Sequence, residues 1–293
     1  MRLIYSKRNI IIVVVILFVI ISTLLIVINS YKVVRSIPPV SEKITPLFSQ
    51  TVIGKSVEGR SINAYTYGNG PTHLAFIGGI HGGYEWNSVL LAYKLIEYLK
   101  ANPLSVPKNI TVTVIPSANP DGVYKVTGKD GPFTIGDVST TTDQSIGRFN
   151  ADKVDLNRNF DCKWQPKSTW KGNVVDAGKS AFSEPETQAI KNFIINDKLN
   201  AVVFFHSQSN AVYASQCDNG ILPKTTAIMN IYAKATGYPA VDVFDSYVVT
   251  GAAEDWLASI NIPAISVELK THETIEWDKN LLGIRALFSY FSK

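Results

Sequence analysis

The sequence predicts an α/β protein: a three-layer α/β/α domain with a mixed, mostly parallel central sheet, preceded by one N-terminal transmembrane helix. Two observations predict this class. Apolar runs of strand length alternate along the chain with segments whose apolar residues recur at helical spacing, which is typical of a largely parallel sheet covered by helices. Ahead of them, residues 9–31 contain no charged residue and exceed the roughly 20 residues that a helix needs to cross a bilayer.

The apolar stretch at residues 9–31 is predicted to be an uncleaved membrane anchor. Its apolar core is longer than that of a signal peptide, and its end offers no Ala-x-Ala-like cleavage site. Lys and Arg flank both ends, so the charge bias that orients such helices is slight. We expect a single-pass protein with a short cytoplasmic tail at residues 1–8, a proline-containing tether at 32–50 and one domain outside the cytoplasm at 51–293.

The composition of the remaining chain is that of a globular protein. Apolar residues make up 46% and charged residues 18% of the sequence, which is enough apolar surface for a sizeable core. The overall charge of +4 comes from the first 43 residues, and the remaining 250 carry a net charge of −1. This near-neutral domain argues against a nucleic-acid partner. Cys162 and Cys217 allow one disulfide, but the sequence does not show whether they meet in space.

The elements of the domain follow from the local patterns. Apolar, β-branched or alternating runs predict strands from about residue 51 and at residues 61–67, 73–77, 110–115, 201–205 and 262–269. Helical spacing predicts helices at residues 86–99, 222–236 and 277–291. Ser183 and Glu186 form a capping-box signature, which predicts a helix that runs to about Lys198. Asn119-Pro120-Asp121-Gly122 is predicted to be a turn, and residues 125–152, with little periodicity, an active-site loop region.

One stretch, Gly78 to Trp86, places candidate metal ligands at the end of a strand. His81 and Glu85 follow the strand at 73–77 after two glycines, which let the backbone turn tightly and approach a ligand closely. His206 directly follows the strand at 201–205, so it too is expected at the carboxyl end of the sheet, where open α/β sheets bind ligands. Two imidazoles and one carboxylate with a fourth position open are the ligand set of a catalytic zinc site. We therefore expect one Zn²⁺ per chain.

The chain resembles the M14 family of zinc metallocarboxypeptidases from about Val52 to the C-terminus. The segments that carry the resemblance, besides the two His regions, occur in the family's order. They are Asn119-Pro120-Asp121-Gly122, Val154-Asp155-Leu156-Asn157-Arg158-Asn159-Phe160, Phe182-Ser183-Glu184-Pro185-Glu186-Thr187, Tyr247 ahead of Gly251, Asp255-Trp256, and Val267-Glu268-Leu269. The Asn-Arg-Asn motif is specific, whereas Asn-Pro-Asp-Gly alone would be only a turn.

The resemblance implies a role for each of five further residues. Arg158, with Asn157 beside it, would hold the free terminal carboxylate of a peptide, which suits the two-donor fork of arginine. Tyr247 would close over the same carboxylate from a mobile loop. Arg148 would stabilise the developing oxyanion. Glu268, at the end of a strand, would take a proton from the attacking water and pass it to the departing amine.

Two features of the sequence leave alternatives open. The family pattern has two residues between the His and Glu ligands, whereas here Gly82, Gly83 and Tyr84 make three. A helical segment would place both ligands on one face, and a glycine-rich turn could loop out the extra residue. Glu254 lies where the family carries the residue at the floor of the side-chain pocket. An acidic residue there implies a preference for basic C-terminal residues, and the alternative is a solvent-exposed Glu254 at a helix start.

The leading hypothesis is a membrane-anchored zinc carboxypeptidase that acts on peptide or protein C-termini. An alternative is a cell-wall peptide hydrolase of the same fold, which cuts next to an amine-bearing diamino acid. A third candidate, an N-acyl amino acid deacylase, is disfavoured by Asn157, Arg158 and Tyr247. A fourth candidate is a peptide-binding module that has lost catalysis, as the wide spacing between His81 and Glu85 would allow.

Overall fold

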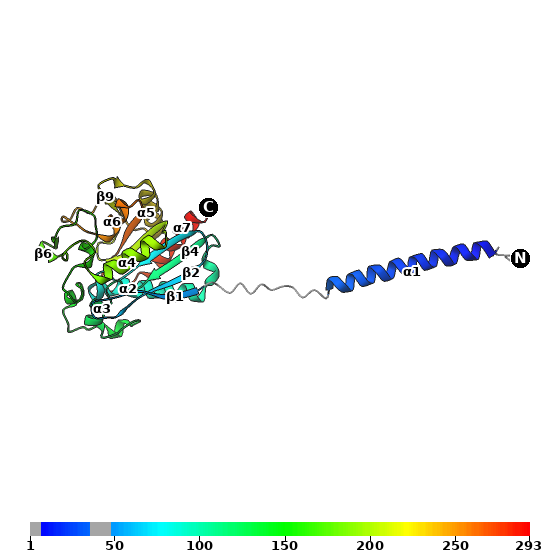
Figure 1. Ribbon diagram of the computed structural model, residues 1–293, viewed down its shortest axis with the longest axis horizontal. Helices are drawn as coiled ribbons and strands as arrows, with labels where there is room; N and C mark the ends of the chain where they lie inside the picture. Colours follow the sequence, from blue (N-terminus) through cyan, green and yellow to red (C-terminus); the bar gives the residue numbers. More distant parts are fainter. Residues whose placement is uncertain (1–6, 36–47) are drawn as a thin grey trace. The chain divides into compact units, whose positions relative to one another are not determined.

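The computed structural model describes residues 7–35 and 48–293, which belong to two separate units. The first unit contains helix α1 (Lys7–Arg35), which extends beyond the predicted residues 9–31 at both ends (Figure 1). Its segment Val14–Tyr31 is long and apolar enough to cross a membrane. A signal sequence near an N-terminus can meet the same criteria of length and apolar composition. Residues 1–6 of the predicted tail and 36–47 of the predicted tether lie outside the described residues.

The second unit is built on a mixed sheet of eight strands within residues 48–293. Their order is β1 (Phe48–Lys55), β2 (Ser61–Gly68), β4 (Ile110–Ile115), β3 (Thr72–Ile77), β7 (Ala201–Ser207), β12 (Ala264–Leu269), β8 (Ala211–Ala214) and β11 (Ala240–Val241). The four central strands, β4, β3, β7 and β12, are parallel to one another, and β8 and β11 are parallel to each other. The remaining neighbours, β1 with β2, β2 with β4 and β12 with β8, are antiparallel. Strand β1 begins three residues before the predicted domain boundary.

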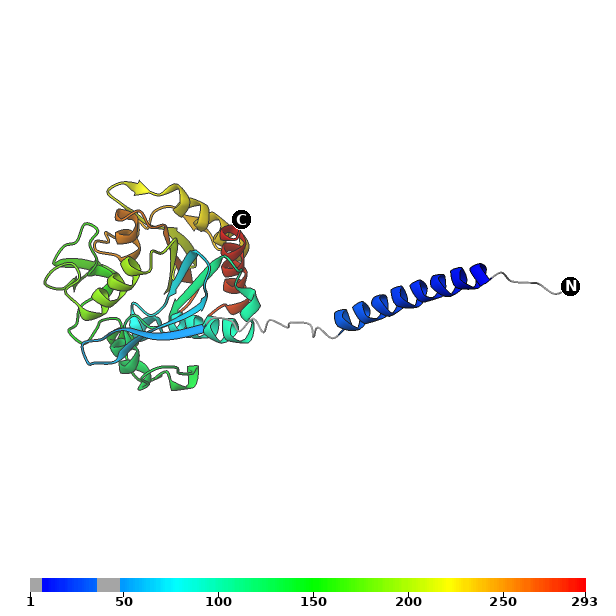
Figure 2. The ribbon, with the colours of Figure 1, turned by 45° about the vertical axis from the view of Figure 1, so that its right-hand side comes forward.

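Helices cover both faces of this sheet, which confirms the predicted three-layer architecture (Figure 2). On one face, α2 (Trp86–Ala101), α5 (Pro223–Thr236) and α7 (Trp277–Phe291) share a core with alternate residues of β7 such as Val203. On the other face, α4 (Pro185–Asn196) and α6 (Ala253–Ser259) share a second core with intervening residues such as Val202. Because both faces of β7 are covered, its sequence is apolar throughout rather than alternating with polar residues.

The capping box predicted at Ser183 is wrong. Helix α4 begins at Pro185, its N-cap is Glu184, and no side chain caps it. Proline favours the first helical position because its ring fixes a helical φ and its missing N–H would be unpaired there. That places Ser183 outside the helix, where its hydroxyl donates to Glu184 Oε1 over 2.7 Å and accepts from Asn159.

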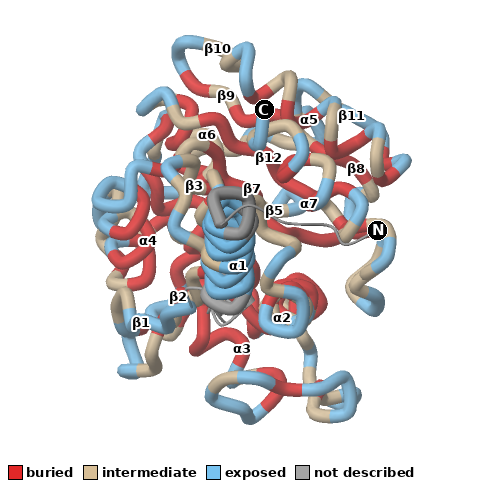
Figure 3. The backbone as a smooth tube through the Cα atoms, turned by 90° about the vertical axis from the view of Figure 1, so that its right-hand side faces the viewer, coloured by how far each residue is buried: buried red, intermediate tan, exposed pale blue. Residues whose placement is uncertain are grey.

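The turn predicted at Asn119–Gly122 is instead the first turn of a helix, α3 (Pro120–Thr127). The Asn119 side chain caps it by accepting a hydrogen bond from the Gly122 N–H, and Pro120 takes the first helical position. The helix is mostly buried (Figure 3). The predicted loop at 125–152 therefore begins inside a helix, and its later part contains only short turns among the described residues. Asparagine and proline open a turn or a helix equally well, and packing decides between them.

Two hairpins and a disulfide complete the side of the domain that holds the site. The hairpins are β5 (Lys167–Trp170) with β6 (Asn173–Asp176), and β9 (Gln216–Cys217) with β10 (Gly220–Ile221). Cys162 and Cys217 form a disulfide with their Cα atoms 6.1 Å apart. The bridge answers the question that the sequence left open, and it joins the segment after Arg158 to strand β9.

Candidate active site

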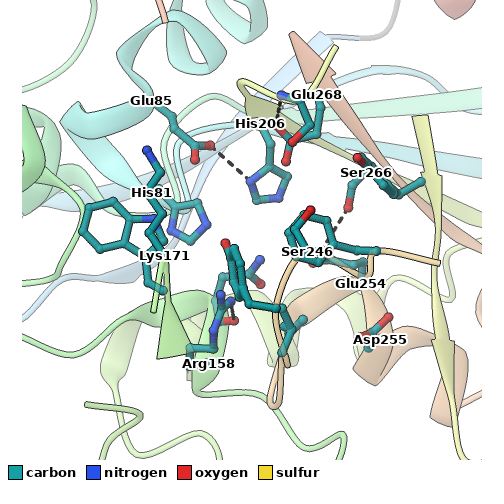
Figure 4. A pocket seen from close by; sticks show the side chains of 18 of the residues that line it. His81, Glu85, Arg158, Lys171, His206, Ser246, Glu254, Asp255, Ser266 and Glu268 are labelled. Carbon is teal, nitrogen blue, oxygen red and sulfur yellow. Dashed lines mark hydrogen bonds and ion pairs between the residues drawn. The ribbon is translucent and has the colours of Figure 1, made fainter. Parts of the chain in front are cut away.

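The three predicted metal ligands converge at the carboxyl end of the central strands. His81 immediately precedes the 3₁₀ turn η1 (Gly82–Glu85), which follows β3, and Glu85 is the last residue of that turn. His206 lies in the neighbouring strand β7. All three side chains are buried, and one donor atom from each lies within 4.8 Å of the others (Figure 4). Parallel strands end at the same edge of a sheet, so residues about 120 positions apart meet here.

The extra residue between His81 and Glu85 is accommodated by glycine. A Cβ atom on Gly82 would lie 2.5 Å from the carbonyl oxygen of Gly147, and one on Gly83 would lie 2.6 Å from that of Gly122. The turn therefore packs its bare backbone against α3 and against the turn η4 (Gln144–Gly147). Of the two alternatives, the structure has the glycine-rich turn rather than a helix with both ligands on one face.

The ligand set fits zinc. Within the described part of the chain, His81 Nδ1 and His206 Nε2 are buried without a hydrogen-bond partner. Burial, and then the positive charge of Arg148, lower the pKa of His81 well below its ordinary value, which keeps the imidazole in the neutral, metal-binding form. Burial opposes a charge on His206 also, but a 3.2 Å hydrogen bond to Glu85 Oε2 and the charge of Glu85 raise its pKa to about 9. Two imidazoles and a carboxylate are zinc ligands.

Arg148 is held beside the metal ligands by Asp155. Its Nε donates a 3.0 Å hydrogen bond to Asp155 Oδ2, and its Nη2 forms an ion pair with the same oxygen at 2.8 Å. Its Nη1 lies 3.9 Å from Glu85 Oε1. The guanidinium also lies over the ring of Trp170, 4.5 Å from the ring centroid. Asp155 Oδ1 is 3.5 Å from His81 Nδ1, so one carboxylate contacts both a predicted ligand and the predicted oxyanion-binding arginine.

Arg158, Asn157 and Tyr247 lie together on the wall of the same pocket. Arg158 donates to the carbonyl oxygens of Asn157 and Thr169, and no carboxylate of the described residues lies within 4.0 Å of it. The Asn157 side chain accepts from the Ala253 N–H through its oxygen, which leaves its NH₂ group as a donor. A buried arginine with no acidic partner is suited to an anionic ligand.

Glu268 lies beside His206. Strands β12 and β7 are parallel, and their register pairs Glu268 with His206. Glu268 Oε2 accepts a 3.2 Å hydrogen bond from the Ser209 N–H. Burial and the negative charge of Glu85 raise the pKa of Glu268 to about 7, against the opposing effect of His206. A carboxylate with such a pKa can both accept and return a proton near neutral pH.

The opposite end of the pocket is acidic. Glu254, on α6, accepts a 3.0 Å hydrogen bond from the Ser266 hydroxyl through Oε1, and its buried Oε2 has no partner among the described residues. Asp255 lines the same end (Figure 4). Burial, and then the charge of Glu254, raise the pKa of Asp255 to about 7. The whole pocket has a volume of about 740 Å³, and in it Glu254 faces the cavity rather than bulk solvent.

Four residues of the site had no role in the sequence analysis: Asp155, Asp255, Lys171 and His272. Asp155 and Asp255 belong to motifs that carry the family resemblance, so an acidic residue within two positions of an expected site residue could have indicated them. Lys171 lies at the tip of the hairpin β5–β6, and His272 lies three residues after β12. Nothing in the local sequence indicates that these last two reach the pocket.

Comparisons with known proteins identify the family to which the sequence is similar. A family profile described as zinc carboxypeptidase matches residues 39–280. The carboxypeptidase N catalytic chain of Rattus norvegicus is 32% identical over 206 residues, which cover 63% of this chain and 41% of that protein. This chain therefore spans less than half the length of that curated relative.

Solved structures share the fold at low sequence identity. Bovine thrombin-activatable fibrinolysis inhibitor, in complex with tick carboxypeptidase inhibitor, aligns with a TM-score of 0.67 and 18% identity, over 83% of this chain and 90% of that one. The murein-tripeptide amidase MpaA from Escherichia coli O157 aligns with a TM-score of 0.57 and 20% identity, over 84% of this chain and 96% of that one. At these identities the likeness shows the fold alone, and it confirms the predicted α/β class.

Proposed function

Because the chain belongs to the zinc carboxypeptidase family, peptidase M14, we propose that it removes single residues from the carboxyl ends of peptides and proteins. The observation that carries the proposal is the combination in one pocket of a His-Glu-His set with Arg158, which has no acidic partner among the described residues. An enzyme that cuts only at chain ends must bind a terminal carboxylate at a fixed distance from the reacting carbonyl. A cation placed beside the metal ligands fixes the distance between the terminal carboxylate and the reacting carbonyl.

The residues of the site suggest how the reaction proceeds. Bound by His81, Glu85 and His206, zinc would act as a Lewis acid that polarises the reacting groups. Arg158 and the Asn157 amide would bind the terminal carboxylate. Arg148, fixed by its ion pair, would stabilise negative charge on the scissile carbonyl oxygen.

Glu268 is proposed as the group that moves the proton. Its carboxylate would accept a proton from the attacking water and deliver it to the nitrogen of the departing residue. The pKa of about 7 supports this role, because the group can then be ionised before the reaction and protonated after the first step. Tyr247, on the pocket wall, would cover the terminal carboxylate during the reaction.

The acidic end of the pocket supports a preference for basic or other amine-bearing C-terminal residues. The free oxygen of Glu254 and the neighbouring Asp255 would receive an ammonium or guanidinium group. A cation there would also offset the cost of burying negative charge. The same end would accept the amine of a diamino acid, and a cell-wall peptide is therefore the second candidate substrate. Comparing release of Lys from a peptide with release of the diamino acid from a cell-wall tripeptide distinguishes the two.

We further propose that α1 anchors the enzyme in a membrane with the catalytic domain outside the cytoplasm. The apolar span and the disulfide between Cys162 and Cys217 support this location, because disulfides persist in oxidising compartments. Protease added to intact cells should digest the domain. Digestion only after the cells are opened would contradict the proposed orientation.

The central test compares wild type with Glu268→Gln on a mixed peptide pool, with zinc content measured in both. The variant should lose C-terminal trimming and keep its zinc, because the side chain moves protons and is not a ligand. Glu273→Gln, an exposed residue beyond β12, is the matched control and should trim like wild type. Wild-type protein that holds zinc but trims no peptide would indicate a binding module instead.

A further inference from the structure

We infer that Lys171 forms a subsite for a carboxylate on the residue immediately before the scissile bond, so that the enzyme favours substrates with an acidic penultimate residue. This inference rests on the proposed function, since it names a substrate class for the same site. It is separate from the acidic end of the pocket, which would bind the side chain of the released residue.

The position of Lys171 is defined by contacts with the metal-binding turn. Its Nζ donates a 2.9 Å hydrogen bond to the hydroxyl of Tyr84, the residue that immediately precedes Glu85. The ammonium also lies 5.6 Å from the ring centroids of Tyr84 and Trp170. On its other side, Tyr84 packs against His272, with ring centroids 4.6 Å apart. Lys171 is exposed, and these contacts place its ammonium at the pocket wall.

The direction of a bound peptide follows from the two ends of the pocket. The released residue would place its carboxylate on Arg158 and its side chain toward Glu254 and Asp255. The scissile carbonyl then lies at the metal ligands, and the preceding residue must continue to the other side of them. Lys171 lines the wall of the same pocket next to Tyr84, across from Glu254 (Figure 4).

Lys171 has a free positive charge at this place. Among residues 7–35 and 48–293, no carboxylate oxygen lies within 4.0 Å of its ammonium. Arg148, the other cation next to Trp170, is neutralised by Asp155. Lys171 and Arg158 are thus two pocket cations without an acidic partner on the described chain. One would bind the terminal carboxylate, and the other is placed for a second anionic group of the substrate.

The test uses the zinc-loaded protein, residues 1–293, in detergent. Its substrates are two acetylated tripeptides, Ala-Glu-Lys and Ala-Gln-Lys, which differ only in charge at the penultimate position. Wild type should release Lys from the Glu peptide about five-fold faster in kcat/KM, the ratio expected of a partly exposed ion pair. Lys171→Met should reduce the ratio to about one, and Lys171→Glu should reverse it. Because both peptides are cleaved by the same sample, the folded fraction cancels from the ratio.

Lys167→Met is the matched control. Lys167 lies on the same hairpin, but it pairs with Asp176 and does not line the pocket, so the variant should keep the wild-type ratio. Equal rates on both peptides by wild type, or an unchanged ratio in Lys171→Met, would overturn the inference and leave the proposed function standing. Failure of wild type to release Lys from either peptide would instead refute the proposed function, and the inference with it.

Discussion

Arg148 and Asp155 form a buried ion pair, in which one carboxylate oxygen accepts a 3.0 Å hydrogen bond from Nε of the arginine and lies 2.8 Å from its Nη2. Both side chains are almost completely shielded from solvent, at 3% and 0% exposure. The same carboxylate approaches His81. Asp155 therefore links the predicted oxyanion-binding arginine to the metal ligands without itself reaching a substrate.

Asp155→Asn should lower the free energy of unfolding by about 3 kcal/mol, because it leaves the buried Arg148 guanidinium without its compensating charge. Urea denaturation measures the change. The exposed pair Lys94–Glu97 on α2 provides the control, and Glu97→Gln should cost less than about 0.5 kcal/mol. Equal losses of unfolding free energy in the two variants would show that burial does not increase the contribution of the Arg148–Asp155 pair to stability.

Gly83→Ala should destabilise the protein and weaken zinc binding together. The added Cβ would meet the Gly122 carbonyl oxygen and the Val126 side chain at 2.6 Å, so the turn that carries Glu85 must shift. Overpacking of this kind costs about 2 kcal/mol. Bound zinc after dialysis and the urea midpoint are the two measurements.

Gly136→Ala is the control for that change, because its Cβ would make only an ordinary 3.6 Å contact with Thr134. It should retain both the zinc content and the stability of wild type. If Gly83→Ala loses stability but binds zinc normally, the turn geometry does not determine the ligand positions.

Glu254→Gln should reduce selectivity for a basic C-terminal residue. Removing one buried charge from the acidic end should lower the ratio of Lys release to Phe release by about ten-fold, which corresponds to about 1.4 kcal/mol. Paired kcat/KM measurements on peptides that end in Lys or Phe test the prediction. Faster release of Phe than of Lys by the wild-type protein would refute the proposed preference for basic C-terminal residues.

Asp255 should make the protein less stable as the pH rises from about 4 to about 7. Burial and the charge of Glu254 raise the pKa of this carboxyl from 3.8 to about 7 in the folded protein. The folded state then binds the proton more tightly than the unfolded chain, so the stability that the group contributes is present below pH 4 and lost as the pH passes through 7.

Asp255→Asn removes this dependence, because an amide does not ionise. After allowance for solvent screening at the pocket, the variant should exceed wild type in unfolding free energy by about 2 kcal/mol at pH 8 and match it near pH 4. Thermal denaturation at the two pH values provides the measurement. A variant that is less stable than wild type at pH 8 would show that the ionised carboxylate has a stabilising partner.

Local patterns were sufficient for most of the fold. Residues 201–205 are apolar on both faces and lie in the centre of the sheet, and the helices at 86–99, 222–236 and 277–291 occur close to their predicted bounds. The errors concern the ends of elements. Ser183 does not cap α4 and Asn119 opens a helix, because several residues with similar local preferences compete for each boundary.

By itself, the sequence determined the fold class through its apolar periodicity, and the family through its motifs that resemble peptidase M14. It also indicated the types of ligand, since His81, Glu85 and His206 follow apolar runs. Only the tertiary structure decided how these residues meet. The glycine turn, the disulfide, and the placement of Asp155 and Lys171 beside the ligands depend on contacts between distant segments. Such contacts are set by the packing of whole elements, and no short stretch of sequence encodes them.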